Sequence, residues 1–377
     1  MKKQRWMKWG IEVAACLLVC STTAMADVEI YGAAKFKTYF ENFSKELTDG
    51  GENAYNNTTW NTGGETVIGF NFEQGDITGQ WEMGAMTDEN TGGSSRGGFV
   101  VREAWGQWDF GAGSLLIGHT APLSDHVVAV GLMYDDEAGL QPVGGTGYDT
   151  DTGRVSQIRL TFGGFALALI TPNTNVEVLD YNEDPVLGMT VRSYLPKLEA
   201  RYDWSFQYLN LSAFGGVQAY KAETDFSGDV SHTVVSYLLA VAGEFNYKSV
   251  TFRAGVNYRQ NGANYGLYTG VRECAYFDGT DIKNTRAIGA VASLGYTFTE
   301  RFYMEVGGSY IHTTTDLAQD TKDSAYAVYL TSKFQLASGV SIHPEIVYYN
   351  YQDPKYMGES YSAGNSTHAG IYWVVEF

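Results

Sequence analysis

The sequence predicts an all-β protein, a transmembrane antiparallel up-and-down β-barrel of about sixteen strands. Apolar and polar residues alternate with a period of two in run after run, which is typical of strands with two different faces. No stretch after Asp27 approaches the roughly 18 consecutive apolar residues of a membrane helix. Short turns alternate with long polar loops, and the 44 Gly, 27 Tyr and only 7 Pro favour strands over helices.

Residues 1–26 read as a signal peptide. Four basic side chains fall within the first eight residues, a short apolar stretch follows at 11–20, and small residues at 24–26 supply a cleavage site. We therefore expect the mature chain to begin at Asp27. A lipoprotein cleavage box at 13–16 is the alternative, although little apolar sequence precedes it.

Charge and cysteine content narrow the class of the mature chain. Removing four bases from 25 and one acid from 43 leaves 21 and 42, a net charge of −21. Such a chain repels phosphate, so we expect no nucleic-acid partner. Cys274 is the one cysteine after Asp27, which excludes an internal disulfide.

The strands follow one another along the whole mature chain. In 250–259, for example, Phe252 and Val256 share one face while Arg253 and Arg259 share the other. The alternating runs are 28–43, 64–73, 77–87, 98–109, 114–119, 155–162, 165–170, 196–204, 207–220, 234–246, 250–259, 286–296, 302–312, 324–334, 340–350 and 368–377. We expect residues 27–377 to form a single barrel domain.

The connections between these runs fall into two classes. The short turns lie at 73–76, 110–113, 163–164, 246–249, 297–301 and 335–339. The long polar loops lie at 44–63, 88–97, 120–153, 171–190, 221–233, 260–285, 313–323 and 351–366. Short turns on one side and long loops on the other are typical of a barrel that spans an outer membrane.

A soluble β-sandwich is the alternative fold, because alternation alone does not say which face is inside. Three features favour the membrane. A strand of about ten residues tilted by about 45° spans roughly 24 Å, which fits the apolar band of a bilayer. Aromatic residues such as Trp81 and Tyr348 lie near strand ends, where headgroups favour them. Third, Lys and Arg on the opposite face can lie in a water-filled lumen and need not be buried in a core.

The last strand, "HAGIYWVVEF", and the segment "REAWGQWDFGAGSLLIGH" at 102–119 resemble the general porins of Gram-negative outer membranes. In that family the terminal strand is the insertion signal for the barrel assembly machinery, which here implies Ile371, Trp373 and Phe377. The resemblance further implies a homotrimer among outer-membrane lipid and lipopolysaccharide. It also implies that the third loop folds inward and narrows the pore.

The predicted constriction has an acidic side and a basic side. Residues 120–153 contain no Lys or Arg, and their carboxylates form the acidic side: Asp125, Asp135, Asp136, Glu137, Asp149 and Asp151. Alternation assigns the basic side to the lumen wall: Lys35, Lys37, Arg102, Arg159, Arg201, Arg253 and Arg259. Opposed charges across a water-filled gap orient dipolar solutes and filter ions. The alternative is that residues 120–153 form an acidic loop on the surface.

One strand conflicts with simple alternation. In 98–109 either register turns a charge outward, Arg102 in one and Glu103 in the other. A charge facing mid-bilayer lipid costs up to ~2–4 kcal/mol. We therefore expect this face to be covered by a subunit contact, or the charge to sit at the membrane rim.

The sequence contains no strong catalytic or cofactor motif. The HExxH zinc spacing and the GxxxxGK phosphate loop are both missing. His119, Ser124, Asp125 and His126 lie close in sequence, but a triad is defined by geometry. Residues 149–153 begin like a calcium loop without completing it, so loop calcium stays open. We expect neither an enzyme nor a cofactor-dependent protein.

These patterns together predict a water-filled channel for passive diffusion of ions and small hydrophilic solutes. Net acidity favours a mild preference for cations. A substrate-specific channel for anions or oligosaccharides is the first alternative, and a barrel enzyme or an adhesin is the second.

Overall fold

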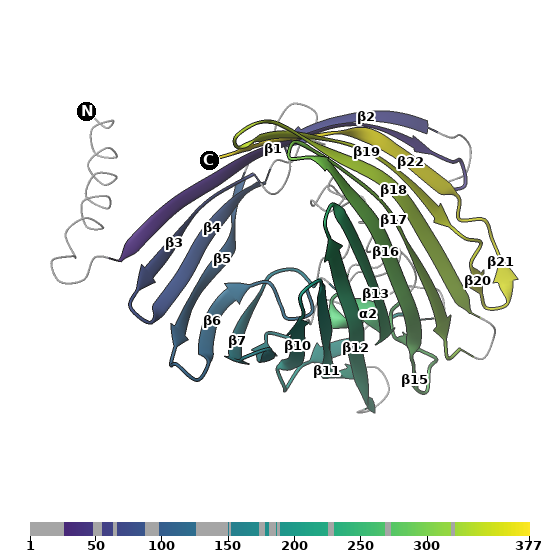
Figure 1. Ribbon diagram of the computed structural model, residues 1–377. Coiled ribbons are helices and arrows are strands. Elements are labelled where there is room, and N and C mark those ends of the chain that lie inside the picture. The colour runs from purple at the N-terminus through teal and green to yellow at the C-terminus, as the bar shows by residue number, and fades with distance from the viewer. Residues whose placement is uncertain are drawn as a thin grey trace, which may run out of the picture.

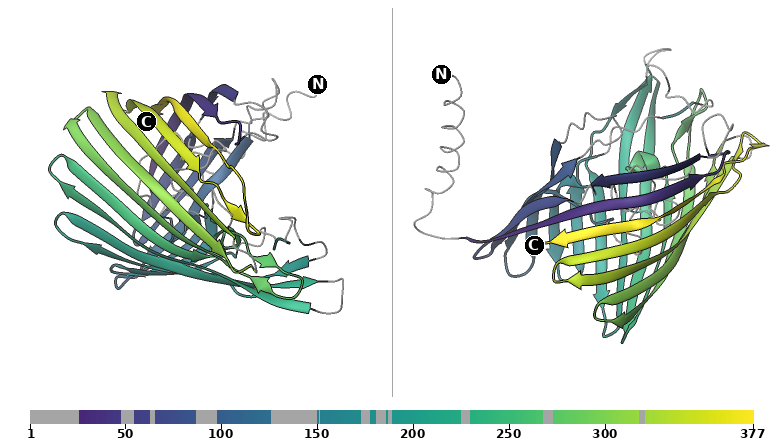
Figure 2. Two further views of the ribbon diagram at one scale, coloured as in Figure 1. Left: turned by 90° about the vertical axis from the view of Figure 1, so that its right-hand side faces the viewer. Right: turned by 90° about the horizontal axis from the view of Figure 1, so that it is seen from above.

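The computed structural model describes residues 26–47, 55–62, 66–86, 98–125, 150, 152–172, 178–180, 186, 189–224, 230–267, 273–317 and 321–377. Long antiparallel strands wind around a common interior (Figures 1 and 2). No helix among these residues is long and apolar enough to cross a membrane.

The strands cover most of the described chain. They are β1 (Asp27–Phe43), β2 (Tyr55–Thr62), β3 (Val67–Gln74), β4 (Ile77–Met86), β5 (Gly98–Asp109), β6 (Ser114–Thr120), β7 (Val155–Phe162), β8 (Phe165–Ile170), β9 (Met189–Arg192), β10 (Lys197–Ser205), β11 (Leu209–Thr224), β12 (Val230–Tyr247), β13 (Val250–Gln260), β14 (Tyr276–Phe277), β15 (Ile282–Lys283), β16 (Thr285–Thr299), β17 (Phe302–Thr315), β18 (Lys322–Ala337), β19 (Val340–Tyr351), β20 (Lys355–Tyr356), β21 (Glu359–Ser360) and β22 (Asn365–Glu376). One short helix, α2 (Gly262–Tyr265), follows β13.

The sheet closes on itself. Neighbouring strands around the barrel pair antiparallel, and β22 returns to pair with β1 from Ala33↔Glu376 to Phe43↔Ser366. Two barrel positions are each built from two segments, because β2 and β3 both pair with β1 while β9 and β10 both pair with β11. The result is a closed antiparallel barrel of 16 strands, which confirms the predicted fold class.

Several strands extend further than alternation indicated. β2 lies inside the expected loop 44–63, and β11 and β12 run on to Thr224 and back from Val230. The sequence of β2, "YNNTTWNT", is polar on both faces, so it carries no period-two signal. Alternation marks only strand segments that need one apolar face, and a strand that continues beyond the membrane does not need one.

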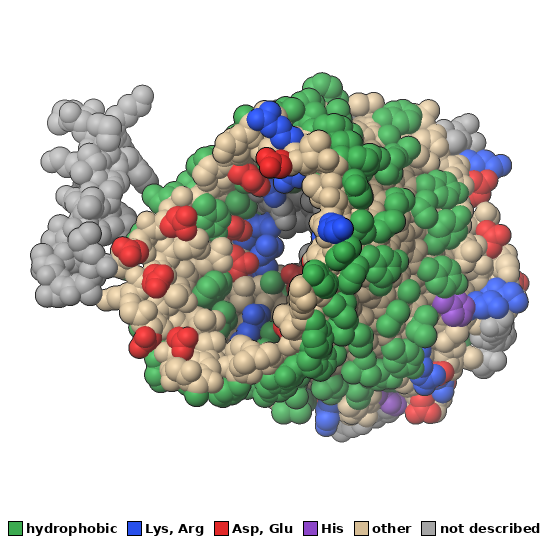
Figure 3. Space-filling view, in the orientation of Figure 1, with side chains coloured by type: hydrophobic (Ala, Val, Ile, Leu, Met, Phe, Trp, Pro, Cys, Tyr) green, Lys and Arg blue, Asp and Glu red, His purple; other side chains and the backbone are tan. Residues whose placement is uncertain are grey.

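The apolar face of each strand points outward. Ile30 is 70% exposed and Val256 is 58% exposed, whereas Lys37 and Arg259 on the opposite faces are 0% exposed. Hydrophobic side chains accordingly cover the outer surface in Figure 3, while charged side chains line the opening. A β-sandwich would bury these apolar faces against each other.

The conflict in β5 is resolved by a β-bulge, not by a subunit contact. Glu103 pairs with Glu82 and Val101 pairs with Met83, so Arg102 is the extra residue. Both charged side chains are buried on the lumen side, at 6% for Arg102 and 8% for Glu103. A bulge changes the phase of alternation, so neither charge faces lipid. An outward charge in β5 was the reason to expect a subunit contact at this strand, and the structure shows no such charge.

Candidate channel lumen and its lining

The predicted basic residues lie on the inward face of the barrel, and four of the seven contact carboxylates of the wall or of an inward loop. Arg102 Nε lies 3.0 Å from Glu82 Oε1, and Arg253 Nη1 lies 2.7 Å from Glu305 Oε2. Pairs of this kind hold the guanidinium groups against the wall, because each charge satisfies the other in a poorly hydrated place. Much of the basic charge is therefore neutralised locally.

The remaining predicted bases have other partners. Arg201 Nε lies 2.9 Å from Asp203 Oδ1, and Arg159 Nη2 donates to the Ala121 carbonyl at 2.5 Å. The Nζ atoms of Lys35 and Lys37 lie 6.0 Å and 5.9 Å from the centre of the Tyr372 ring.

The predicted acidic side is described only at its first residue. The Asp125 carbonyl accepts a hydrogen bond from Arg201 Nη1 at 3.3 Å. Asp135, Asp136, Glu137, Asp149 and Asp151 lie outside the described residues. Their place in the constriction stays a prediction.

Both described ends of the third loop lie against the lumen wall. Leu123 packs on the inward side chains of Ala168 and Ile170 in β8. Ser124 donates from its backbone nitrogen and its hydroxyl to Glu199 of β10, at 2.9 Å and 3.1 Å. At the returning end, Lys197 Nζ donates to Thr152 Oγ1 at 3.1 Å. The loop therefore leaves and re-enters the wall along its inner surface.

A second inward segment, which sequence reasoning missed, follows β13. α2 lies inside the barrel in Figure 1, and Tyr265 and Leu267 pack on inward residues of β11, β12 and β16. Asn261 and Gly266 flank α2 in the left-handed conformation. "NG" at 261–262 and "YG" at 265–266 were the available turn signals. They mark a turn but do not say into which space it folds.

A third loop segment joins this one. Leu179 forms a parallel bridge with Tyr276, and its backbone nitrogen donates to the Ala275 carbonyl at 3.1 Å. Val178 and Ala275 pack with Tyr220, Ala222 and Val234 of the inner wall. Loop residues therefore cover the lumen side of β11 and β12.

A polar depression lies on the opposite part of the lumen wall. It has a volume of about 290 Å³ and is lined by Lys35, Arg253, Lys333, His343 and Tyr372, among others. Bases from β1, β13 and β18 line this depression together with the carboxylate of Glu376, and an excess of bases favours an anion.

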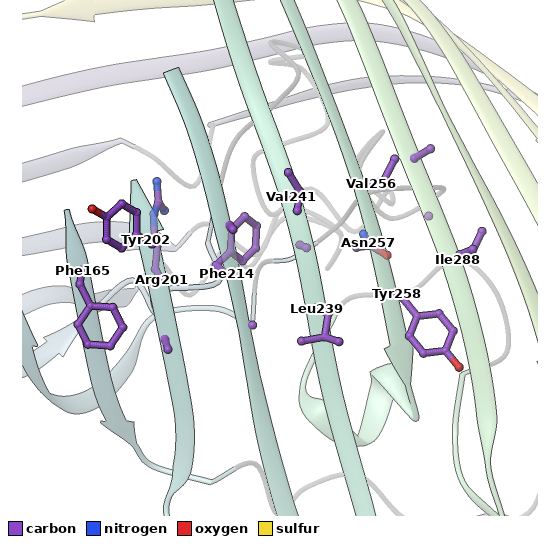
Figure 4. Close-up of a pocket in the computed structure, with 16 residues that line it drawn as sticks. Phe165, Arg201, Tyr202, Phe214, Leu239, Val241, Val256, Asn257, Tyr258 and Ile288 are labelled. Carbon is purple, nitrogen blue, oxygen red and sulfur yellow. The ribbon is translucent and has the colours of Figure 1, made fainter. Parts of the chain in front are cut away.

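A larger depression of about 690 Å³ lies on the outer surface and not in the lumen (Figure 4). Its outward-facing lining includes Leu239, Val241, Val256 and Ile288. These apolar side chains belong to the lipid-facing surface, so this depression is not part of the solute path.

Among the described residues that suggested a hydrolase, Ser124 and His119 have other partners. Ser124 Oγ donates to Glu199, while His119 in β6 pairs in register with Ala104 and Ser156. His126 lies outside the described residues. Within the part of the chain that the structure describes, no three His, Cys, Asp or Glu residues are grouped to hold a metal ion.

A closed barrel with an apolar outside and a charged, hollowed interior defines a membrane channel of the β-barrel class. A family model for Gram-negative porins matches residues 13–354, and the chain belongs to that family. It is therefore a multi-strand β-barrel protein of the Gram-negative outer membrane. No curated protein sequence matches the chain.

Solved structures share this fold at low identity. The outer-membrane channel DcaP of Acinetobacter baumannii aligns with a TM-score of 0.70 and 17% identity, over 95% of this chain and 99% of that chain. The anion-selective porin from Comamonas acidovorans gives 0.61 and 13%, over 94% and 100%. The trimer form of OmpT from Vibrio cholerae gives 0.55 and 14%, over 93% and 99%. At such identities the likeness shows the fold alone.

Proposed function

We propose that this porin is a water-filled channel through which ions and small hydrophilic solutes diffuse passively, with a mild preference for cations. The observation that carries the proposal is the reversed distribution of side chains, with charged residues on the inward face and apolar residues outside. A barrel of about sixteen strands is wide enough to leave an aqueous lumen. Diffusion down a gradient requires no catalytic group and no cofactor.

The proposed cation preference rests on the distribution of acidic residues. Wall bases such as Arg102 and Arg253 contact carboxylates, which offsets part of the basic charge of the wall. The mature sequence has an excess of acid, and residues 120–153 supply acids without any base. We propose that these acids lie along the solute path and concentrate cations there.

Reversal potentials test this proposal. The mature protein is reconstituted in a planar bilayer under a salt gradient and compared with the triple variant Asp135→Asn/Asp136→Asn/Glu137→Gln. We expect the variant to shift the reversal potential toward anions. Glu46→Gln, on the outer rim paired with Lys45, is the control that changes an acid outside this loop. An unchanged potential in the triple variant would remove the acidic loop from the path.

A substrate-specific anion channel is the second candidate, and the basic depression on the lumen wall favours it. Lys35, Arg253, Lys333 and His343 line one space there. If that space binds an anion, millimolar inorganic phosphate should reduce the current saturably, and Lys333→Gln should weaken the block. A current that stays proportional to concentration leaves only general diffusion.

We propose three further partners on the same basis. The chain forms a homotrimer, and the OmpT structure from Vibrio cholerae is likewise a trimer form. Its lipid-facing surface contacts outer-membrane lipid and lipopolysaccharide, and its last strand is recognised by the barrel assembly machinery. Residues 1–26 are removed as a signal peptide. Unheated electrophoresis and mass spectrometry of the purified protein test the oligomer and the mature N-terminus.

A further inference from the structure

Glu199 is a shared contact point for two loops that enter the barrel separately. Its carboxylate accepts from Ser124 at the start of the third loop and from the Tyr265 hydroxyl in the segment after β13, the latter at 2.8 Å. Lys197 Nζ lies 3.3 Å from Glu199 Oε1 and 4.5 Å from the centre of the Tyr265 ring. All four side chains are at most 2% exposed.

The neighbouring strand β11 leaves room for this contact. A Cβ atom at Gly216 of β11 would collide with the Tyr265 hydroxyl and with Glu199 Cγ, so the absence of a side chain leaves room for both. Burial, and then the Glu199 carboxylate, raise the pKa of the Tyr265 phenol well above its ordinary value. The phenol therefore stays protonated and remains a donor at physiological pH.

The segment after β13 is also held to the wall at other points. Arg259 contacts Glu273 through two hydrogen bonds, at 2.7 Å and 2.6 Å. Asn264 donates to the Tyr220 hydroxyl and accepts from the Ala275 backbone nitrogen, both at 2.7 Å. Residues 261–267 and 273–277 thus form a shelf fixed to the inner wall, which we call the lumenal shelf.

We propose that the lumenal shelf is a second narrowing element of this channel and that Glu199 is the positioning residue that fixes it together with the third loop. The shelf occupies space on the lumen side of β11 and β12 that a bare wall would leave to water. Because both loops contact one carboxylate, release of one loosens the other. The claim about pore width rests on the proposed channel function, whereas the claim about anchoring does not.

The barrel contains a matched arrangement for control experiments. Tyr329 donates to Glu305 Oε1, and a Cβ atom at Gly307 would meet the Tyr329 ring. These partners also include a buried inward carboxylate, but Tyr329, Glu305 and Gly307 all lie on wall strands β17 and β18. Changes there disturb the same chemistry without touching a loop.

Cys274 is a native probe inside the shelf. It is partly buried, and it is the one cysteine of the predicted mature chain. We would measure its modification rate with a negatively charged methanethiosulfonate in Tyr265→Phe and Glu199→Gln, with Tyr329→Phe and Glu305→Gln as controls. Loss of one hydrogen bond shifts a docking equilibrium by about 2- to 10-fold. We expect rate increases of this size in the first pair and none in the controls.

Single-channel conductance of the same variants in planar bilayers tests the narrowing. We expect higher conductance or noisier open levels in Tyr265→Phe and Gly216→Ala, and wild-type conductance in Tyr329→Phe and Gly307→Ala. Equal Cys274 rates in all proteins, or equal increases in variants and controls, would overturn the anchoring role of Glu199. Faster modification with unchanged conductance would overturn the narrowing role. Absence of any current in the wild type would instead refute the proposed function, while the thiol rates would still decide the anchoring.

Discussion

Arg259 and Glu273 form a bidentate ion pair in which both side chains are at most 1% exposed. Arg259 lies on β13 and Glu273 follows the loop that contains α2, so the pair ties a loop to the wall. Buried pairs contribute little to net stability compared with apolar replacements, yet removal of one partner leaves a charge without water or counter-ion.

We expect Glu273→Ala to destabilise the protein by about 3–5 kcal/mol, since it removes the carboxylate that pairs with the buried Arg259. The double variant Arg259→Met/Glu273→Leu should recover most of that loss. Urea titration in detergent, followed by the shift between folded and unfolded bands on unheated gels, measures the difference. Equal destabilisation by the single and double variants would contradict this explanation.

The bulge in β5 makes an unusual deletion tolerable. Removing Arg102 restores regular alternation, so that Val101 stays outward and Glu103 stays inward. We expect the shortened chain to assemble, with loss of the Glu82 contact. Folded yield in the outer-membrane fraction, judged by heat-modifiable migration, is the readout.

Deletion of Val256 is the control for the bulge, because β13 is regular. The deletion would force one half of β13 to exchange its inward and outward faces. If the half after Val256 changes, Arg259 faces lipid. A charge at the bilayer midplane costs about 2–4 kcal/mol, and the buried pair with Glu273 would be lost as well. If both deletions fold equally well, the facing derived for β5 is wrong.

Asp278 gives a pH-dependent contact in a loop outside the membrane. Hydrogen bonds from the Asp281 backbone, then from Lys283 and the Thr280 backbone, lower the pKa of Asp278 from 3.8 to about 2. A lowered pKa means that the folded loop favours the carboxylate, so this contribution is present above pH 4 and is lost as the pH falls toward 2. The turn at 278–283 should therefore loosen only in strong acid.

Pepsin, which acts in this pH range, measures the loosening. We expect the rate of cleavage beside Phe277 to be higher at pH 2 than at pH 4, after the pepsin activity at each pH is corrected with a reporter peptide. In Asp278→Asn we expect the high rate at both pH values. Equal corrected cleavage rates at pH 2 and pH 4 in the wild type would mean that Asp278 does not fix this turn.

The terminal Phe377 has a backbone role and an exposed side chain. Its nitrogen and carbonyl exchange hydrogen bonds with Gly32, at 3.0 Å and 2.9 Å, while the side chain is 75% exposed. We expect Phe377→Ala to lower assembled protein in cells, because we propose that the assembly machinery recognises the ring. Refolding of the purified variant from urea into detergent should match the wild type. Equal losses in both assays would make the ring a packing residue.

The period-two pattern by itself determined most of the strands and their two faces, because every membrane-spanning strand must show one apolar face to lipid and one polar face to the lumen. Phe252 and Arg253 illustrate this, since their facing follows from the sequence once the lipid side is known. The same rule placed Lys37 and Arg259 inward. It was silent for β2, whose residues are mostly polar on both faces, and it could not place Arg102 and Glu103 inward together, because a bulge is a local change of phase.

Only the tertiary structure decided how the lumen is filled. Glu199 meets Ser124 and Tyr265 although 75 and 66 residues separate them in the chain. A polar loop over water and a polar loop folded into a wet lumen have the same composition, since both are hydrated on one side. What separates them is a set of long-range contacts, and such contacts exist only after the barrel has closed and brought its walls within reach of the loops.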